Sequence, residues 1–246
     1  MKEDRYQQIL KILSDGRYTS VERLSEQLFV SLPTIRRDLT AMQEMGLVVR
    51  SHGGVVKRST DNDGPPQPFR AGVNAGAKLK IAKAAAGLLR DNSVIFLDES
   101  TTVMHLVDHL TDRDNITVIT NNMSVVQQVS KYRIAVYCLG GRLDYNTMSF
   151  YGPEAMESVE RFGIDMVFFS SSALTPFGMI ADYCEDANEM RRKVLQIAET
   201  SIFLCDRSKL GRHGLHILAP LKDVDCLITD GQLPADMPAP ENVIIV

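Results

Sequence analysis

The fold of this chain is decided by a stretch in its first fifth, Ser31-Leu32-Pro33-Thr34-Ile35-Arg36-Arg37-Asp38-Leu39. Ser31 is a favoured N-cap, because its hydroxyl can accept a backbone N–H of the first helical turn. Pro33 falls in that turn, where its missing N–H costs little. Apolar residues then recur at spacings of four and three, at Ile35, Leu39 and Met42. The stretch therefore predicts a short helix with an apolar face, and with Arg36 and Arg37 on another face.

A helix of this kind fits the major groove of DNA. The alternative is a solvent-exposed charged helix face, which a short basic run does not exclude on its own. The neighbouring sequence favours the first interpretation. Residues 5–13 predict an earlier helix, and Thr19 with Glu22 forms a capping-box pattern that predicts a second helix ending near residue 28. Gly46 is a typical end for the third helix.

The residues after Gly46 predict a hairpin. Two β-like runs, residues 47–50 and 55–57, flank Ser51-His52-Gly53-Gly54. Three helices followed by a hairpin make a winged helix-turn-helix, in which one helix enters the major groove and the wing lies near the backbone or minor groove. We expect base or phosphate contacts from Arg36 and Arg37, and backbone contacts from Arg50 and the wing. The complete set of expected DNA contacts is Ser31, Pro33, Thr34, Arg36, Arg37, Thr40, Arg50 and His52.

The distribution of charge agrees with a DNA-binding head. The 246 residues carry a net charge of −4, which alone argues against a nucleic-acid binder. Residues 1–58 contain ten Lys and Arg and seven Asp and Glu, a net +3, which leaves 17 of the 27 basic and 24 of the 31 acidic residues, a net −7, for the remainder. A small basic head on an acidic body fits a local DNA footprint.

Composition divides the chain into three parts. Residues 1–57 are the DNA-binding domain, residues 58–76 are a Ser/Asp/Gly/Pro-rich linker that we expect to be flexible or extended, and residues 77–246 are an α/β domain. No signal peptide follows the start and no apolar run approaches membrane-spanning length, so we expect a cytoplasmic protein. The cysteines lack metal-site spacing and are expected to be reduced and mostly buried thiols: Cys138, Cys184, Cys205 and Cys226.

The body alternates helical patterns with continuous apolar runs. Helices are predicted over residues 80–89, 103–110, 124–130 and 185–201. Strands are predicted over residues 94–97, 116–119, 134–139, 166–169, 202–205, 226–229 and 243–246. Such strands between helices predict a mostly parallel sheet that is covered on both faces.

Polar residues follow five of these strands, and ligands of such sheets bind beyond the carboxyl ends of the strands. Hydroxyls and free backbone N–H groups at strand-to-helix turns suit a phosphate. Arg142 and Lys209 can supply positive charge, and Asp98 or Asp206 can accept sugar hydroxyl protons. Taken singly, Ser and Thr at these places are ordinary helix caps. The convergence of five polar strand ends is what predicts a ligand site.

The chain resembles the DeoR family of bacterial regulators of sugar metabolism over nearly its whole length. In the head the resemblance lies in residues 30–39, Gly46 and the Arg50-Ser51-His52-Gly53-Gly54 wing. It implies a winged helix-turn-helix followed by a sensor domain similar in fold to ribose-5-phosphate isomerase and the coenzyme A transferases. It also implies a repressor of a carbohydrate-utilisation operon that a phosphorylated sugar releases from double-stranded operator DNA. We expect no cofactor, no metal and no catalytic residue.

The resemblance places a phosphate loop at residues 98–102, with further effector contacts around it. The implied effector residues are Asp98, Ser100, Thr101, Thr102, Thr120, Asn121, Gly140, Gly141, Arg142, Gly152, Glu185, Asp206, Ser208 and Lys209, with Thr229 and Asp230 nearby. The family usually has Gly where Ser100 stands, and a Gly-containing turn where this chain has Ser170-Ser171-Ser172. Because one small head buries too little DNA surface for specific binding, a homodimer or homotetramer is expected.

Two other functions stay open. A sugar-phosphate isomerase would need a positioned carboxylate base, and Gly140-Gly141 is followed by Arg142-Leu143-Asp144 rather than by paired carboxylates. An activator, or a regulator without a sugar-phosphate effector, remains an alternative because Ser100 restricts φ and adds bulk at the loop. His105 and His109 have i, i+4 spacing, but without HExxH or an adjacent carboxylate they indicate a helix face rather than a metal site.

Overall fold

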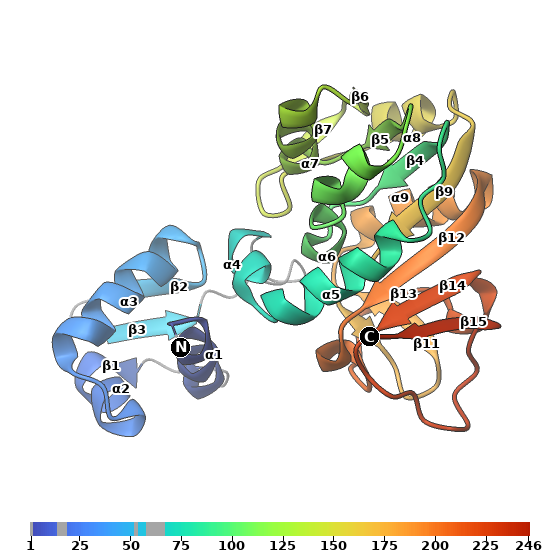
Figure 1. The fold of residues 1–246 in the computed structure, drawn as a ribbon. Helices are drawn as coiled ribbons and strands as arrows, with labels where there is room; N and C mark the ends of the chain where they lie inside the picture. Colours follow the sequence, from blue (N-terminus) through green and yellow to red (C-terminus); the bar gives the residue numbers. More distant parts are fainter. Residues whose placement is uncertain (1, 14–18, 52–53, 58–66) are drawn as a thin grey trace. The chain divides into compact units, whose positions relative to one another are not determined.

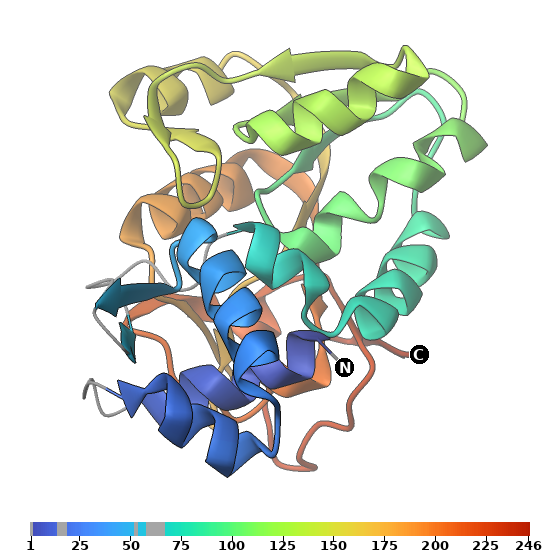
Figure 2. The ribbon, with the colours of Figure 1, turned by 90° about the vertical axis from the view of Figure 1, so that its left-hand side faces the viewer.

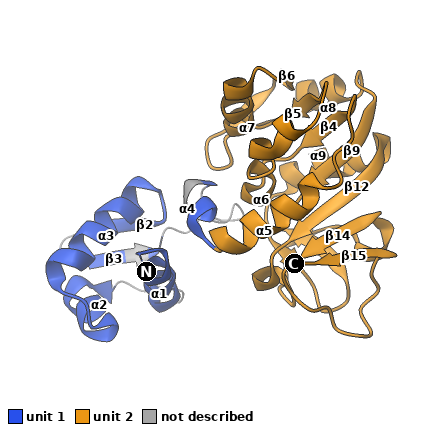
Figure 3. Ribbon diagram, in the orientation of Figure 1, with its two compact units in different colours: residues 1–73 blue, residues 74–246 orange. Residues whose placement is uncertain are grey.

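The computed structural model describes residues 2–13, 19–51, 54–57 and 67–246 (Figure 1). The chain forms two compact units, residues 1–73 and residues 74–246 (Figure 3). Of the expected linker, residues 58–66 lie outside the described part. The expectation of a flexible or extended tether is wrong for the following segment, because Gln67–Gly72 is a helix, α4, with a proline in its first turn, where proline is tolerated.

The first unit is a winged helix-turn-helix, as the sequence predicts. Its helices are α1 (Lys2–Ile12), α2 (Val21–Leu28) and α3 (Leu32–Glu44). Its antiparallel sheet has the order β1-β3-β2 and consists of β1 (Thr19–Ser20), β2 (Val48–Ser51) and β3 (Gly54–Lys57). The predicted apolar stripe of α3 is fully buried at Ile35, Leu39 and Met42. Burial of this stripe against α1 and α2 leaves the opposite face of α3 exposed.

Two capping predictions for the first unit are wrong in detail. Thr19 does not cap α2, because it lies in β1; the N-cap is Ser20, whose hydroxyl accepts the N–H of Arg23 at 3.1 Å. Ser31 occupies the N-cap position of α3, but its hydroxyl pairs with the Thr34 hydroxyl at 2.9 Å and not with a backbone N–H. Thr19 is displaced from the cap position because it pairs with Val55 of β3, whereas the partner of Ser31 is a local one in the first turn of α3.

The second unit is built on a seven-stranded parallel sheet with the order β15-β14-β12-β9-β4-β5-β6. The strands are β4 (Val94–Leu97), β5 (Thr117–Thr120), β6 (Ala135–Cys138), β9 (Ile164–Phe169), β12 (Ala198–Cys205), β14 (Cys226–Thr229) and β15 (Asn242–Ile245). The predicted parallel sheet is therefore confirmed. The chain runs from β4 to one edge through β5 and β6, and then from β9 to the other edge.

Each face of this sheet carries its own apolar core, because alternate side chains of a strand point to opposite faces. On one face, Ile95 and Leu97 of β4 pack with α5 (Ala75–Ala86), α6 (Thr101–Met104), the 3₁₀ helix η2 (Val107–Asp112) and α7 (Met123–Val129). On the other face, Phe96 packs with α8 (Pro153–Val159), α9 (Glu185–Ile197) and a small antiparallel sheet. Figure 2 gives a second view of the ribbon. Both faces are thus covered, as predicted.

The remaining elements of the second unit are short. The small sheet, in the order β10-β11-β13, consists of β10 (Ala173–Leu174), β11 (Met179–Asp182) and β13 (His216–Pro220). A hairpin is formed by β7 (Arg142–Asp144) and β8 (Ser149–Tyr151). The other 3₁₀ helices are η3 (Ser130–Tyr132), η4 (Arg207–Lys209) and η5 (Leu221–Asp223).

Several predicted boundaries in the second unit are wrong. The helix predicted over 103–110 is divided into α6 and η2. The helix predicted to run to residue 201 ends at Ile197, because Ala198 and Thr200 already pair with β9 as the start of β12. The thiols are not mostly buried: Cys205 and Cys226 are buried, Cys184 is half-buried and Cys138 is exposed. No helix in the described residues is long and apolar enough to cross a membrane.

Candidate functional site

The exposed face of α3 carries most of the expected DNA contacts. The exposed residues of this region are Ser31, Pro33, Arg36, Arg37 and Thr40, and Arg50 in β2 is exposed as well. Thr34 is half-buried. His52 lies outside the described residues. In the part of the chain that the structure describes, no ion pair involves Arg36 or Arg37. Their positive charges therefore remain available to an anionic partner.

Hydrogen bonds hold the wing against α3. Arg50 donates from Nη1 to the Thr40 hydroxyl at 2.7 Å, and this hydroxyl donates to the Arg36 carbonyl at 2.9 Å. The Nε of Arg37 lies 3.5 Å from the carbonyl of Pro33. These contacts place cationic groups of α3 and β2 on one continuous surface.

A partly buried ion pair fixes the orientation of α3. Arg5 of α1 donates to both carboxylate oxygens of Asp38, from Nε at 2.5 Å and from Nη2 at 3.0 Å. The hydrogen bonds to Asp38 raise the pKa of Arg5. Because Asp38 is 3% exposed and stands on the same side of α3 as the apolar stripe, this pair sets the rotation of the helix and so the direction of its exposed arginines.

In the second unit the strand order reverses between β4 and β9, and in α/β sheets such switch points are where ligands bind. The loops after these two strands are bonded to each other. Asp98, directly after β4, accepts the Ser100 N–H at 2.9 Å and the Ser170 N–H, directly after β9, at 3.1 Å. The structure thus brings together two strand ends that are 72 residues apart.

Next to this switch point, Arg191 of α9 forms a buried cluster of ion pairs. Its guanidinium donates to Asp98 at 3.0 Å and to Asp182 at 2.8 Å, and it also pairs with Glu99. Arg191, Asp98 and Glu99 are each at most 3% exposed. One guanidinium therefore serves three carboxyl groups, and Asp98 is committed to the protein's own N–H groups and to Arg191.

The excess of carboxyl groups changes the protonation of Glu99. Burial, together with the negative charges of Asp98 and Asp182, raises the pKa of Glu99 to about 7, although Arg191 acts in the opposite direction. The neighbouring groups shift with it. Burial and the charge of Glu99 raise the pKa of Tyr151 well above its ordinary value, and burial raises the pKa of Cys184 to about 11.

A second cluster beside the switch point is positively charged. Lys209 donates from Nζ to the Ser170 hydroxyl at 2.7 Å and lies 3.7 Å from a carboxylate oxygen of Asp206. Lys78 of α5 is buried and donates to the Thr101 hydroxyl at 2.9 Å. Burial by itself raises the pKa of Asp206, but Lys209, the Ser208 hydroxyl and Lys78 together hold it below its ordinary value.

The chain entering the second unit is attached to the same cluster. Asn74, just before α5, has left-handed backbone angles and its side chain does not cap α5. Its amide instead donates to Asp206 at 3.1 Å and to the Ser208 hydroxyl at 2.8 Å. The first residue of the second unit is therefore bonded directly to two expected effector residues.

The expected residues after β5 and β6 form a neighbouring group around the β7–β8 hairpin. Thr120 donates to the carbonyl of Leu97 at 2.7 Å, and Asn121 donates to the carbonyl of Phe150 at 3.1 Å. Gly141 has a φ of 123°, and a Cβ at this position would lie 2.6 Å from a backbone oxygen. Gly152 has a φ of 105° and Gly140 has open space around it. These glycines shape the turn and carry no polar side chain.

Two expected residues have partners at the surface. Arg142 pairs with Asp186, at the start of α9. Glu185 lies 2.9 Å from Arg192 and 3.1 Å from Nδ1 of His216. Thr229 is buried and holds the N–H of Gly231, whereas Asp230 accepts the N–H of Arg207 at 2.6 Å. The charges of Arg142 and Glu185 are therefore already compensated in the described structure.

Ser100 adopts an ordinary extended conformation, with φ −73° and ψ 140°, so a glycine is not required there by the backbone. Its hydroxyl caps α6 by accepting the Val103 N–H at 3.1 Å. The Ser100 hydroxyl thus occupies one of the backbone N–H donors at this strand-to-helix turn. By contrast, the Thr102 hydroxyl and the carbonyl oxygen of Asn121 are buried without a hydrogen-bond partner among the described residues.

The residues that sequence reasoning missed are Arg191, Lys78 and Asn74. Arg191 carries a signal that could have identified it, because it falls on the buried stripe of α9 with Ala187, Met190 and Val194. A charged residue on such a stripe needs a buried partner. Asn74 carries no comparable signal because it lies at the end of the segment with linker composition, and Lys78 carries none because it stands before the helical pattern expected from residue 80.

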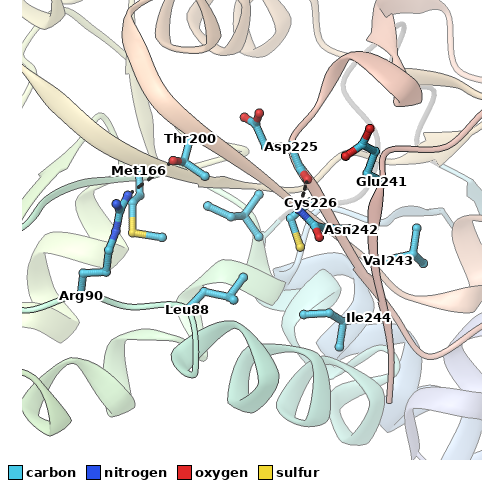
Figure 4. A pocket seen from close by; sticks show the side chains of 11 residues that line it. Leu88, Arg90, Met166, Thr200, Asp225, Cys226, Glu241, Asn242, Val243 and Ile244 are labelled. Carbon is cyan, nitrogen blue, oxygen red and sulfur yellow. Dashed lines mark hydrogen bonds between the residues drawn. The ribbon is translucent and has the colours of Figure 1, made fainter.

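A cavity of about 520 Å³ lies elsewhere, and none of the expected effector residues lines it (Figure 4). Its walls include Thr200, Cys226 and Asn242, which stand at the starts of β12, β14 and β15. The cavity therefore lies at the amino ends of these strands, whereas the switch point lies at the carboxyl ends. No group of three His, Cys, Asp or Glu residues suited to a metal ion occurs within the described ranges.

Known families and proteins match both units. Residues 5–61 match the DeoR-like helix-turn-helix domain, and residues 73–231 match the DeoR C terminal sensor domain. The HTH-type transcriptional repressor GlcR of Bacillus subtilis is 32% identical over 93% of this chain and 88% of its own length. The L-fucose operon activator of Haemophilus influenzae is 32% identical over 93% of this chain and 92% of its own length.

Among solved structures, ribose 5-phosphate isomerase A of Methanocaldococcus jannaschii is 20% identical, with a TM-score of 0.43 over 56% of this chain and 55% of that one. The two family matches together span both units, and both relatives, which match over 88% and 92% of their own lengths, are named as regulators. A DNA-binding helix-turn-helix followed by this sensor domain defines the group. The chain therefore belongs to the DeoR family of transcriptional regulators.

Proposed function

We propose that this protein is a repressor of a carbohydrate-utilisation operon, which binds operator DNA through its first unit and is released when a phosphorylated sugar binds the second unit. The observation that carries the proposal is the presence of two separate groups of cations: Arg36 and Arg37 on α3, which have no ion pair among the described residues, and Lys209 with the buried Lys78 at the switch point of the sheet. The first suits nucleic acid and the second suits a small anion.

On the DNA side, Arg36 and Arg37 contact bases or phosphates, while Arg50 and the wing contact the backbone. Two neighbouring contacts, from Ser31 and Thr34, belong to the N-terminal end of α3, which is the end that reaches base edges in helix-turn-helix proteins. Pro33, Thr40 and His52 complete the proposed set. The protein acts as a homodimer or homotetramer, because one such domain buries too little DNA surface for specific binding.

On the effector side, the phosphate is bound near Lys209, Ser208 and Thr101. Lys209 has only a 3.7 Å contact to Asp206 as its ion pair, so a phosphate oxygen gains a strong charge-assisted hydrogen bond from it. The sugar lies toward Thr102 and Asn121, whose buried oxygens have no hydrogen-bond partner in the described structure and suit hydroxyl donors. Asp98 positions the loop rather than binding the sugar, because its oxygens are already occupied.

The DNA side is tested with Arg37→Ala in a mobility-shift assay on the full chain. We expect loss of a phosphate or base contact to weaken operator binding by roughly tenfold or more. Arg161→Ala is the matched control, since Arg161 is an exposed arginine in the second unit. Binding by Arg37→Ala that equals binding by the control would exclude α3 as the DNA-reading element.

The effector side is tested by thermal denaturation with a panel of pentose and hexose phosphates. A ligand present at 100 times its Kd stabilises the folded state by about 2.7 kcal/mol. Lys209→Met should remove that stabilisation and also the ability of the same compound to dissociate the DNA complex. If no sugar phosphate stabilises the wild-type chain, the effector part of the proposal is wrong.

A second candidate function is that of an activator. It is favoured because one relative is the L-fucose operon activator. The two functions differ in the sign of regulation and not in the DNA-binding surface. Transcription from a bound promoter in a purified system separates them: a repressor lowers the transcript level and the sugar phosphate restores it. No isomerase activity is expected, because the relatives are regulators and the carboxylates at the switch point are held by Arg191.

A further inference from the structure

Phe29, in the turn between α2 and α3, is unfavourable in two independent respects. Its backbone is left-handed, with φ 53° and ψ 41°, a conformation in which glycine or asparagine is expected. Its side chain is 96% exposed, so it gains nothing from burial within the protein. An aromatic residue at this position therefore does not contribute to folding of the first unit.

The turn nevertheless holds Phe29 in a defined position. The Phe29 N–H donates to the carbonyl of Glu26 at 3.3 Å, and the next N–H, of Val30, donates to the carbonyl of Ser25 at 3.1 Å. The Ser25 hydroxyl donates to the carbonyl of Val30 at 2.5 Å. The ring thus projects from a hydrogen-bonded turn that ends α2 and leads directly to Ser31.

The surroundings of Phe29 indicate what would cover it. The exposed face of α3 follows closely in the chain, since Ser31 stands two residues after Phe29. On this face, Arg36 and Arg37 have no carboxylate partner in the described residues. Val49 of β2, 49% exposed, is the other large apolar side chain exposed in the described part of the first unit. A protein interface needs a larger apolar patch than this. A single exposed aromatic ring near arginines that have no ion pair in the described residues fits a partner that carries many negative charges and also offers apolar groups.

We propose that Phe29 makes an apolar contact with DNA at the edge of the groove that α3 enters. The deoxyribose carbons and thymine methyl groups are the apolar surfaces that DNA offers there. Phe29 thereby extends the DNA interface beyond the set expected from the sequence. The proposal rests on the DNA-binding role of the first unit and adds a non-ionic contact to it.

The test uses the full chain and a DNA duplex that the wild-type protein selects from a random-sequence pool. Fluorescence anisotropy gives the Kd of wild type, Phe29→Asn, Phe29→Gly and Phe29→Leu. Removing the ring should raise the Kd by roughly tenfold, because burial of an aromatic side chain is lost. Phe29→Leu should retain most of the affinity. The matched control is Phe177→Asn, which removes a 79% exposed phenylalanine from the second unit and should leave the Kd unchanged.

Two further measurements separate a DNA contact from other effects. Asn and Gly suit the left-handed turn, so the melting temperatures of these variants should equal or exceed that of wild type. The slope of log Kd against log salt should be unchanged in Phe29→Asn, but smaller by about one in Arg37→Ala, because only the arginine neutralises a phosphate.

A folded Phe29→Asn variant with wild-type affinity would overturn the proposal. So would a change in the mass of the DNA-free protein by sedimentation, since that would assign Phe29 to contact with a second copy of the chain. Failure of the underlying DNA role has a different signature. In that case Arg37→Ala and wild type would bind the duplex equally, whatever Phe29→Asn does.

Discussion

Replacing Glu99 by Gln should make the protein more stable at alkaline pH and change little at acidic pH. Glu99 is buried beside Asp98 and Asp182, and its pKa is raised from 4.5 to about 7. A carboxyl group whose pKa is higher in the folded than in the unfolded protein makes folding less favourable as the pH rises. The loss begins near pH 4.5, is complete just above pH 7, and stays constant at higher pH.

The magnitude follows from the two pKa values. Each pKa unit corresponds to about 1.4 kcal/mol, so the change from 4.5 to about 7 represents roughly 3 kcal/mol. Gln resembles the protonated carboxyl group and does not ionise, while Arg191 keeps Asp98 and Asp182 as partners. At pH 8 the Glu99→Gln variant should therefore be more stable than wild type by roughly 3 kcal/mol, and at pH 5, where the loss has only begun, by about 1 kcal/mol or less.

The assay is urea unfolding of the full chain, followed by circular dichroism at pH 5 and at pH 8. The quantity of interest is the difference in unfolding free energy between variant and wild type at each pH. Glu199→Gln is the control, because Glu199 is exposed and its replacement should change stability by less than ~0.5 kcal/mol at either pH. A Glu99→Gln variant that is destabilised at pH 8, or that differs from wild type equally at both pH values, would refute the reasoning.

Three further perturbations test other parts of the structure. Asp38→Asn removes the charged acceptor of Arg5, and should lower the stability of the first unit by about 2 kcal/mol in thermal melts and weaken DNA binding. Gly141→Ala should cost about 2 kcal/mol or more, because φ is 123° and the Cβ would clash with a backbone oxygen, whereas Gly140→Ala has open space and should cost less than ~1 kcal/mol. Cys138 is exposed and should be the first thiol to react with a thiol reagent in the native protein; slower labelling of it than of the buried thiols would contradict the position of β6.

The periodic parts of the fold were predictable because their burial patterns are regular. The stripe of α3 and the apolar strand β4 have the expected residues at the expected places, since helix and strand periods decide which side chains are buried. The short antiparallel pieces β10, β11 and β13 were missed because two to five residues do not establish a period. Residues 198–201 extended a helical pattern in the sequence, and pairing with β9 overrode that local preference.

The candidate effector site was predictable in part for a different reason. The sequence shows which residues follow each strand, but not which strands are neighbours. Asp98 and Ser170 meet only because β9 inserts beside β4, and Arg191 reaches Asp98 and Asp182 only because α9 packs next to the ends of both β4 and β11. Polar residues after strands could therefore be proposed singly from the sequence, whereas their hydrogen bonds and the altered protonation of Glu99 depend on the spatial order.

The attachment of Asn74 has a consequence for how the two units communicate. A ligand that engages Ser208 and Asp206 competes for the same oxygen atoms that hold the Asn74 amide. Asn74 is joined by a single peptide bond to Val73, the last residue of the first unit. If the proposed effector binds at these strand ends, its binding would break or preserve the side-chain hydrogen bonds of Asn74, at the point where the chain leaves for the first unit.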